Sequence, residues 1–256
     1  MSSRIFAKEE LIRRVHEQNK KDEFYRIPAL NYKGKTDDGK LYTEEIAAWL
    51  AGKIDEGMEE EILLQHANMQ DSEKEQTSPI HPKGPQKYSA GSNRDEENIA
   101  KRLMEQNNLQ VHNFAATQVV DFQVPINRVN HSSQGKVDLI LTNNCQTIIG
   151  ELKDADSPET LLRAMVEIRT YQQKIVQYGF VKDRFVKSYG HKSIQPAVLF
   201  FENTQPWIDF LEMKKNNRPA LDKLAKKWDI LFFLVKTVGP MDMDVVQNNN
   251  FYLERV

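Results

Sequence analysis

Two short apolar segments separated by a polar turn constrain the fold of this chain more than any other feature. Residues 136–142 (KVDLILT) and 146–153 (QTIIGELK) both carry the apolar side chains of buried strands. Asn143 and Asn144 between them favour a tight turn. We therefore predict two antiparallel, neighbouring strands at the centre of a sheet.

The segments around this hairpin predict a mixed sheet flanked by helices. A helix over 158–178 is indicated by Ser157 at its N-cap and Pro158 in its first turn. Pro125 favours an edge position for the strand that contains it. The other expected elements are helices at 94–107, 204–215 and 219–228 and strands at 118–127, 195–201 and 229–237. The apolar stripe of the long helix is Leu161, Met165, Ile168 and Ile175. The order is that of an α/β domain.

A polar stretch at 68–93 divides the chain. It contains three prolines, two glycines and almost no apolar residues, so it is expected to be a linker or flexible loop. Residues 1–67 before it predict a small, acidic and mainly helical unit. Its helices are expected at 5–18 and from an N-cap at Thr43 to about Lys53, with a turn at 37–39. Residues 94–256 form the main domain.

Composition sets broad limits on function. The chain has 256 residues, 39% of them hydrophobic and 28% charged, with a formal net charge of -2. It has no apolar run long enough for a membrane span and no signal-peptide pattern at its start. The single cysteine, Cys145, excludes an internal disulfide and a cysteine-based zinc site. We expect a cytoplasmic protein without a membrane partner.

Three polar residues of the hairpin carry the chemistry. Asp138 stands inside the first apolar strand, while Glu151 and Lys153, two residues apart, share one face of the second. Carboxylate oxygens suit Mg²⁺, with Mn²⁺ as a substitute. Such an ion activates water and neutralises charge on a phosphodiester, and the lysine orients the water or stabilises the transition state. Because Lys153 ends a strand, its replacement is expected to leave the fold intact.

Gly135-Lys136-Val137-Asp138 followed by Gly150-Glu151-Leu152-Lys153 resembles the motif of the PD-(D/E)XK nuclease superfamily, although Val137 stands where the family usually has proline. The resemblance covers roughly residues 94–201 and implies a restriction-endonuclease-like fold, a mixed central sheet with an αβββαβ core. It also implies that Asp138, Glu151 and the Leu152 carbonyl bind the metal, and that Lys153 is the catalytic lysine.

Two further features of the superfamily have counterparts in this sequence. A glutamate in the helix before the sheet often adds a metal ligand, and Glu97 is preferred here over Glu96. In the exonuclease branch a Gln-x-x-x-Tyr pair follows the lysine strand; here Glu167 replaces the glutamine and Tyr171 is present. Because residues four apart share a helix face, Arg163, Glu167 and Tyr171 form one polar stripe.

The distribution of charge suggests where nucleic acid binds. Residues 1–80 carry 17 acids and 12 bases, a net of -5, whereas 182–227 carry 10 bases and 5 acids, a net of +5. We expect a DNA track that begins at Lys182, Arg184, Lys187 and Lys192. RNA as substrate, endo or exo action, and a homodimer stay open. The alternative function is a nuclease-fold module that binds nucleic acid or protein with little or no hydrolysis.

Overall fold

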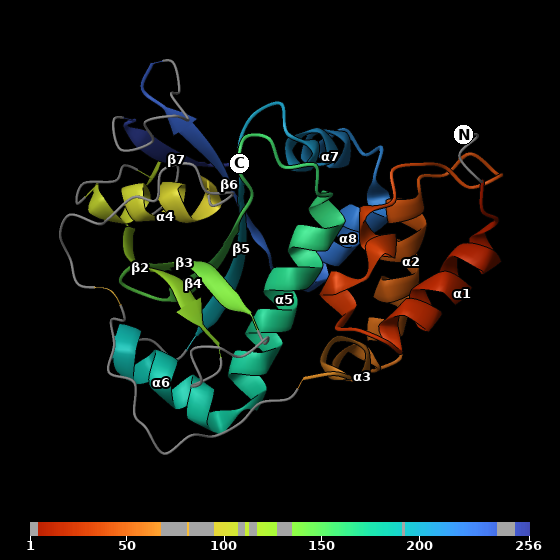
Figure 1. The fold of residues 1–256 in the computed structure, drawn as a ribbon, viewed down its shortest axis with the longest axis horizontal. Coiled ribbons are helices and arrows are strands. Elements are labelled where there is room, and N and C mark those ends of the chain that lie inside the picture. Colours follow the sequence, from red (N-terminus) through yellow and green to blue (C-terminus); the bar gives the residue numbers. More distant parts are fainter. Residues whose placement is uncertain are drawn as a thin grey trace.

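The computed structural model describes residues 5–67, 81, 95–106, 111–112, 117–126, 135–190, 193–239 and 249–256. The expected linker at 68–93 lies outside this part of the chain, apart from His81. Within the described residues the protein is a mixed α/β structure built on one sheet (Figure 1).

The sheet has seven strands in the order β1-β7-β6-β5-β4-β3-β2. Its strands are β1 (Val111–His112), β2 (Gln118–Pro125), β3 (Lys136–Thr142), β4 (Thr147–Leu152), β5 (Ile194–Phe200), β6 (Leu231–Thr237) and β7 (Phe251–Arg255). β2, β3 and β4 are antiparallel neighbours, whereas β4, β5 and β6 run parallel. β2 forms one edge, as Pro125 predicted, because proline lacks the N–H that a central strand donates.

Each face of the sheet has its own apolar core. Helix α4 (Asp95–Glu105) covers one face, where Ile99 and Leu103 pack against Leu139 and Leu152. Helix α5 (Leu161–Gln177) covers the other face, and its predicted stripe is fully buried there. After α5 the chain continues through α6 (Gly179–Tyr189), α7 (Gln205–Lys214) and α8 (Pro219–Lys227). Figure 1 shows α4 and α5 on opposite sides of the sheet.

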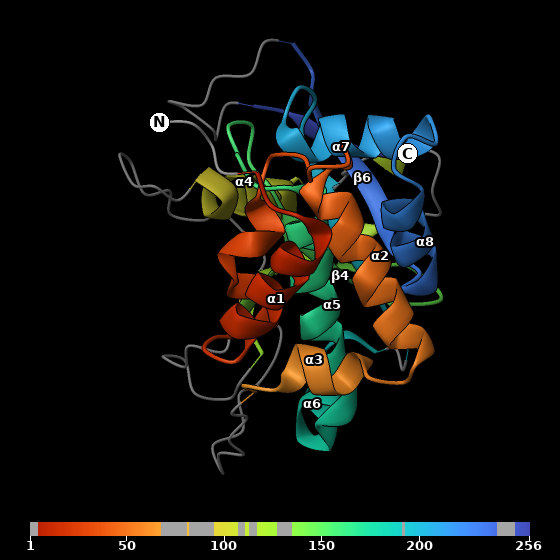
Figure 2. The same cartoon turned by 90° about the vertical axis from the view of Figure 1, so that its right-hand side faces the viewer.

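The N-terminal unit packs outside α5 and shares its core. It consists of α1 (Lys8–Asn19), the 3-10 turns η1 (Phe24–Arg26) and η2 (Pro28–Asn31), α2 (Tyr42–Asp55) and α3 (Glu59–Leu64). Apolar residues of this unit, among them Phe24, Ile46 and Leu63, belong to one continuous buried cluster with Ile168 and Phe185. Figure 2 shows α1, α2 and α3 in front of α5.

Opposite charges join the N-terminal unit to α8. Asp55 of α2 pairs with Lys223, at 3.3 Å, and with Lys227 of α8. The Glu44 carboxylate accepts the backbone N–H groups of Ala220 and Leu221 and so caps the start of α8. Part of the acidic surplus of one segment is therefore neutralised by the basic surplus of the other.

Two predicted helix starts are wrong. Thr160, not Ser157, caps α5: its hydroxyl accepts the N–H of Arg163 and donates to the carbonyl of Leu30. Thr43 lies in the first turn of α2 rather than at its N-cap, and its hydroxyl accepts a hydrogen bond from Arg218 at 2.6 Å. In both cases a contact with a distant segment decides where the helix begins.

None of the helices within the described residues combines the length and the apolar character needed to cross a membrane.

Candidate active site

The strands β3 and β4 separate where Asp138 and Glu151 stand. Their pairing ends at Leu139 and Gly150, and the two acids are the next residue on each strand. Both lie two residues beyond the paired Ile140 and Ile149 and therefore face α5. In place of a ladder bond, Oδ2 of Asp138 accepts the backbone N–H of Leu152 at 2.9 Å. The resemblance implied a role for the carbonyl of Leu152. The group of Leu152 that contacts Asp138 in the structure is its backbone N–H.

Lys153 lies among carboxylates just beyond β4. Its ammonium is 2.7 Å from Glu151, 2.8 Å from Glu159 and 3.5 Å from Glu167. Glu159 reaches the lysine because α5 begins at Leu161, so that Glu159 lies before the helix rather than in its first turn. The sequence analysis did not assign Glu159 to this cluster.

Glu167 and Tyr171 hold each other on α5. The Tyr171 hydroxyl donates to Glu167 Oε1 at 2.9 Å, and Oε2 of the same carboxylate faces Lys153. Arg163 turns to Glu159 instead, at 3.0 Å. The polar stripe predicted on this helix therefore borders Lys153, with Glu159 between Arg163 and the lysine.

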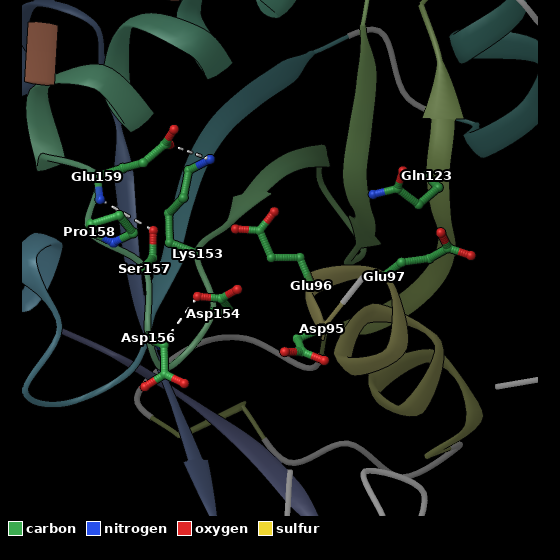
Figure 3. A pocket seen from close by; sticks show the side chains of 10 residues that line it. All are labelled: Asp95, Glu96, Glu97, Gln123, Lys153, Asp154, Asp156, Ser157, Pro158 and Glu159. Atoms are coloured by element: carbon green, nitrogen blue, oxygen red, sulfur yellow. Dashed lines mark hydrogen bonds and ion pairs between the residues drawn. The ribbon is translucent and has the colours of Figure 1, made fainter. Parts of the chain in front are cut away.

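Glu96, rather than Glu97, lies beside the lysine. Figure 3 shows the two side chains leaving α4 in opposite directions, with Glu96 pointing towards Lys153. Glu96 accepts the backbone N–H of Asp154 and interacts with the charges of Lys153 and Asp138. Glu97 pairs with Lys101 of its own helix at 2.7 Å. Of the two glutamates, the structure therefore brings Glu96 to Lys153 and pairs Glu97, the residue preferred from the sequence, with its own helix, since residues one apart on a helix point about 100° apart.

Gln123 is a further site residue that sequence reasoning did not find. It lies on β2 with a φ of 46°, a left-handed conformation uncommon for a side chain other than glycine. Its amide donates to Asp138 Oδ1 at 2.7 Å, so both oxygens of that carboxylate are fixed. A glutamine within a strand gives no sequence signal for such a role.

An acidic cavity opens above this cluster. It has a volume of about 450 Å³, and Gln123, Ser157 and Pro158 contribute to its wall (Figure 3). Among the residues that the structure describes, one cation, Lys153, lines it together with six acids: Asp95, Glu96, Glu97, Asp154, Asp156 and Glu159. Asp138 and Glu151 are not among the residues that line the cavity, and both are almost fully buried.

Burial and mutual repulsion raise the pKa values of the acids. Burial raises the pKa of Asp138 to about 6, although Lys153 and the Leu152 amide oppose the shift. Burial, with the charges of Asp138 and Glu167, raises the pKa of Glu151 well above its usual range. Burial also raises the pKa of Glu96 to about 8. These groups hold protons that a cation would displace.

Lys153 stays protonated. Burial alone would lower the pKa of Lys153, but Glu151, Glu167, Glu96 and Glu159 outweigh it and raise this pKa well above its ordinary value. Burial opposes ionisation of Glu167, yet Lys153 and the hydrogen bond from Tyr171 lower the pKa of that carboxyl. The cluster therefore has a permanent cation and one firmly ionised acid beside it.

Three of the four predicted nucleic-acid residues lie on α6, and they differ in exposure. Lys187 is exposed and Lys182 half-buried. Arg184 is buried, and its guanidinium donates to the carbonyls of Pro125 and, at 3.2 Å, Ile126. It thereby ties α6 to the end of β2. Lys192 lies outside the described residues.

No protein-family profile, curated protein or solved structure matches this chain.

Proposed function

We propose that the protein is a metal-dependent nuclease that hydrolyses phosphodiester bonds, with DNA as its first expected substrate and a restriction-endonuclease-like core. One observation carries the proposal. Asp138 and Glu151, from adjacent strands, lie on one sheet face together with Lys153, which also lines an acidic cavity. We include a cytoplasmic location in the proposal, since Cys145 is exposed and free.

The charge balance supports a divalent cation. Five carboxyl groups, those of Glu96, Asp138, Glu151, Glu159 and Glu167, interact with the single ammonium of Lys153. So many buried acids are costly unless cations neutralise them. Nucleic-acid phosphates would also be repelled from the cavity unless a cation is present.

The donor atoms suit Mg²⁺ or Mn²⁺. Oε2 of Glu151 is buried and has no hydrogen-bond partner among the described residues. The neighbouring donors are carboxylate oxygens, which these hard ions prefer. No three Asp, Glu, His or Cys side chains in the described part of the chain are by themselves arranged as a complete metal site. Backbone, water and substrate oxygens would complete the coordination of an ion held by Asp138 and Glu151.

The residues have distinct roles in this proposal. Asp138, Glu151 and the carbonyl of Leu152 would hold the ion, and Glu96 of α4 would add negative charge near it. A bound Mg²⁺ supplies activation of a water molecule and neutralisation of phosphate charge. Lys153, kept protonated by its neighbours, binds and stabilises the negative charge of the phosphate in the transition state. Gln123 fixes the orientation of Asp138.

One observation favours a second function. The ammonium of Lys153 is already paired with three carboxylates, as in an ion cluster that serves structure alone. The alternative is therefore a nuclease-fold module that binds nucleic acid or protein without hydrolysing it.

A cleavage assay separates the two functions. Purified full-length protein is incubated with linear, circular and single-stranded DNA and with RNA, in EDTA, Ca²⁺, Mg²⁺ or Mn²⁺. We expect Mg²⁺- or Mn²⁺-dependent cleavage by the wild type and none by Glu151→Gln prepared in parallel, which controls for contaminating nucleases. Equal cleavage by both preparations, or none by the wild type on any substrate, would refute the nuclease proposal.

A further inference from the structure

A line of polar side chains connects the candidate active site to the N-terminal unit. It starts at Lys153, passes to Glu167, and continues to the hydroxyl of Tyr171. From Tyr171 it crosses to Tyr25 of η1: the rings meet edge to face with centroids 5.4 Å apart, and each hydroxyl influences the pKa of the other. The line thus leaves the sheet domain through a tyrosine pair.

Tyr25 is held firmly from the N-terminal side. Its hydroxyl donates to Glu23 Oε2 at 3.0 Å and accepts from Arg26 Nε at 2.8 Å. The other oxygen of Glu23 pairs with Lys174, a lysine of α5 that is fully buried. Tyr25 itself is 2% exposed. Its hydroxyl therefore has a single position, set by groups from both segments.

The hydroxyl of Tyr171 is also closely packed against Gly135. Gly135, with a φ of 90°, lies against it, and a Cβ atom there would stand 2.5 Å from the tyrosine hydroxyl. The absence of a side chain at Gly135 leaves the room that this hydroxyl occupies, just before β3 begins at Lys136. The hydroxyl of Tyr171 therefore stands between the start of the strand that bears Asp138 and the carboxylate of Glu167.

A purely structural interface does not need this arrangement. Apolar side chains of similar volume hold buried surfaces together as well as a buried ion pair does, and often better. Here Glu23 and Lys174 are buried with two tyrosines, in the middle of a continuous apolar cluster. The polar groups converge on one atom, the Tyr25 hydroxyl, which faces Tyr171.

We propose that Tyr25 is a positioning residue for the candidate active site: its hydroxyl anchors its ring against Tyr171, whose own hydroxyl holds Glu167 against Lys153. The inference rests on the proposed nuclease function and assigns the N-terminal unit a part in it. Glu23, Arg26 and Lys174 act one step further out by orienting Tyr25.

The test compares Tyr25→Phe with Tyr42→Phe in the full-length protein. Each variant loses one hydroxyl from a buried tyrosine of the N-terminal unit, but the Tyr42 hydroxyl accepts the N–H of Phe6, at 3.0 Å, within that unit. Mg²⁺-dependent cleavage by Tyr25→Phe should show kcat lowered about tenfold with KM nearly unchanged, because orientation acts on the chemical step. Tyr42→Phe should match the wild type.

A second readout does not depend on cleavage. The Tyr171 hydroxyl donates to Glu167 Oε1, so a loosened Tyr171 should change the carbon-13 chemical shift of that carboxyl. Carbon-13 NMR of labelled glutamate carboxyls at one fixed pH, with Glu167→Gln as the assignment variant, measures this change. We expect a changed shift in Tyr25→Phe and the wild-type shift in Tyr42→Phe.

The two readouts keep the proposals apart. If the wild type cleaves but Tyr25→Phe has the kcat of Tyr42→Phe, the role of Tyr25 is refuted and the nuclease proposal stands. If the wild type cleaves nothing, the nuclease proposal fails, and the presence or absence of the carboxyl shift still decides whether Tyr25 positions Glu167. A double variant, Tyr25→Phe with Tyr171→Phe, should be no slower than Tyr171→Phe alone; additive losses would contradict action through Tyr171.

Discussion

The ammonium of Lys153 lies 2.7 Å from Oε1 of Glu151, while Oε2 of the same carboxylate has no hydrogen-bond partner among the described residues. Lysine and cation are therefore competitors for one carboxylate as well as partners in the proposed reaction. This competition, together with the excess of buried acids around it, determines how the protein should respond to mutation and to pH.

Replacing Lys153 by alanine should abolish cleavage and yet tighten metal binding. Loss of the ammonium frees Glu151 for Mn²⁺, while the phosphate loses its stabilising charge, at a cost of about 100-fold or more in rate. Calorimetry with Mn²⁺ and a cleavage assay measure the two effects. Lys101→Ala, which removes another buried lysine paired with a glutamate, is the control. Mn²⁺ affinity equal to that of the wild type would contradict the competition.

The same variant should be less stable without metal. Lys153 is 5% exposed and makes three ion pairs, so the expectation that it contributes little to the fold is not supported by the structure. Removing one partner of buried charges costs about 3 kcal/mol of unfolding free energy. Urea denaturation measures this loss, and saturating Mn²⁺ should recover much of it.

The affinity for Mn²⁺ should rise with pH between about 6 and 8. Asp138 has a pKa of about 6 and Glu96 of about 8, and each must lose its proton before it attracts a cation. Calorimetry in buffers of different ionisation enthalpy reports the protons released. Glu96→Gln should remove the part of the rise near pH 8 and leave the part near pH 6. A pH-independent affinity in the wild type would count against metal binding at these residues.

The metal-free protein should lose stability as pH rises. A carboxyl whose folded-state pKa is raised contributes stability that is present below its unfolded pKa and is lost as pH rises through the folded value. For Glu96 this window extends from about 4.5 to about 8. At pH 9 Glu96→Gln should therefore be more stable than the wild type by on the order of 1 kcal/mol.

Glu97→Gln provides the matched comparison, because it changes the neighbouring glutamate. It removes an ion pair with Lys101 and should lower stability slightly at every pH while retaining cleavage. Thermal unfolding from pH 5 to pH 9 distinguishes the two variants. If Glu97→Gln were the variant that gained stability and lost cleavage, the assignment of Glu96 would be reversed.

Nucleic-acid binding should depend on Lys182 and Lys187. Arg184 is buried and bonded to backbone carbonyls, so its replacement should act on the structure of α6 instead. Replacing both lysines by glutamine should weaken binding and reduce the slope of log affinity against log salt by about 2, roughly one for each phosphate contact. Binding is measured in Ca²⁺ over a salt series. Lys223 and Lys227, which pair with Asp55, are the control pair and should leave the slope unchanged. An unchanged slope in the Lys182 and Lys187 variant would place the binding face elsewhere.

Local patterns predicted most of the sheet domain. The hairpin of β3 and β4, the burial of the α5 stripe and the edge position of β2 follow from alternation, periodicity and the missing N–H of Pro125. The helix α6 and the strands β1 and β7 were missed. β1 has only two residues and pairs with the distant β7, Val111 opposite Leu253, and β7 itself has only five residues, so neither has a local signal strong enough to predict it.

The sequence predicted those residues of the candidate site that are charged side chains within or next to apolar strands. An aspartate in an apolar strand and Glu-x-Lys on the next one predicted Asp138, Glu151 and Lys153 as neighbours. Glu159 and Glu96 required the true start of α5 and the rotation of α4 about its axis, which depend on tertiary contacts. Gln123 required a backbone conformation that no sequence pattern indicates.

The packing of α2 on α8 has a consequence for folding kinetics. Glu44 and the amide of Ala220 are 176 residues apart in sequence, and the contact forms only after most of the chain has been synthesised. Closing so long a loop carries an entropic cost before any contact compensates for it, which slows folding. During synthesis the apolar face of the N-terminal unit therefore emerges before the helices that cover it. We expect that face to be where chaperones bind the nascent chain, and refolding to be limited by its docking.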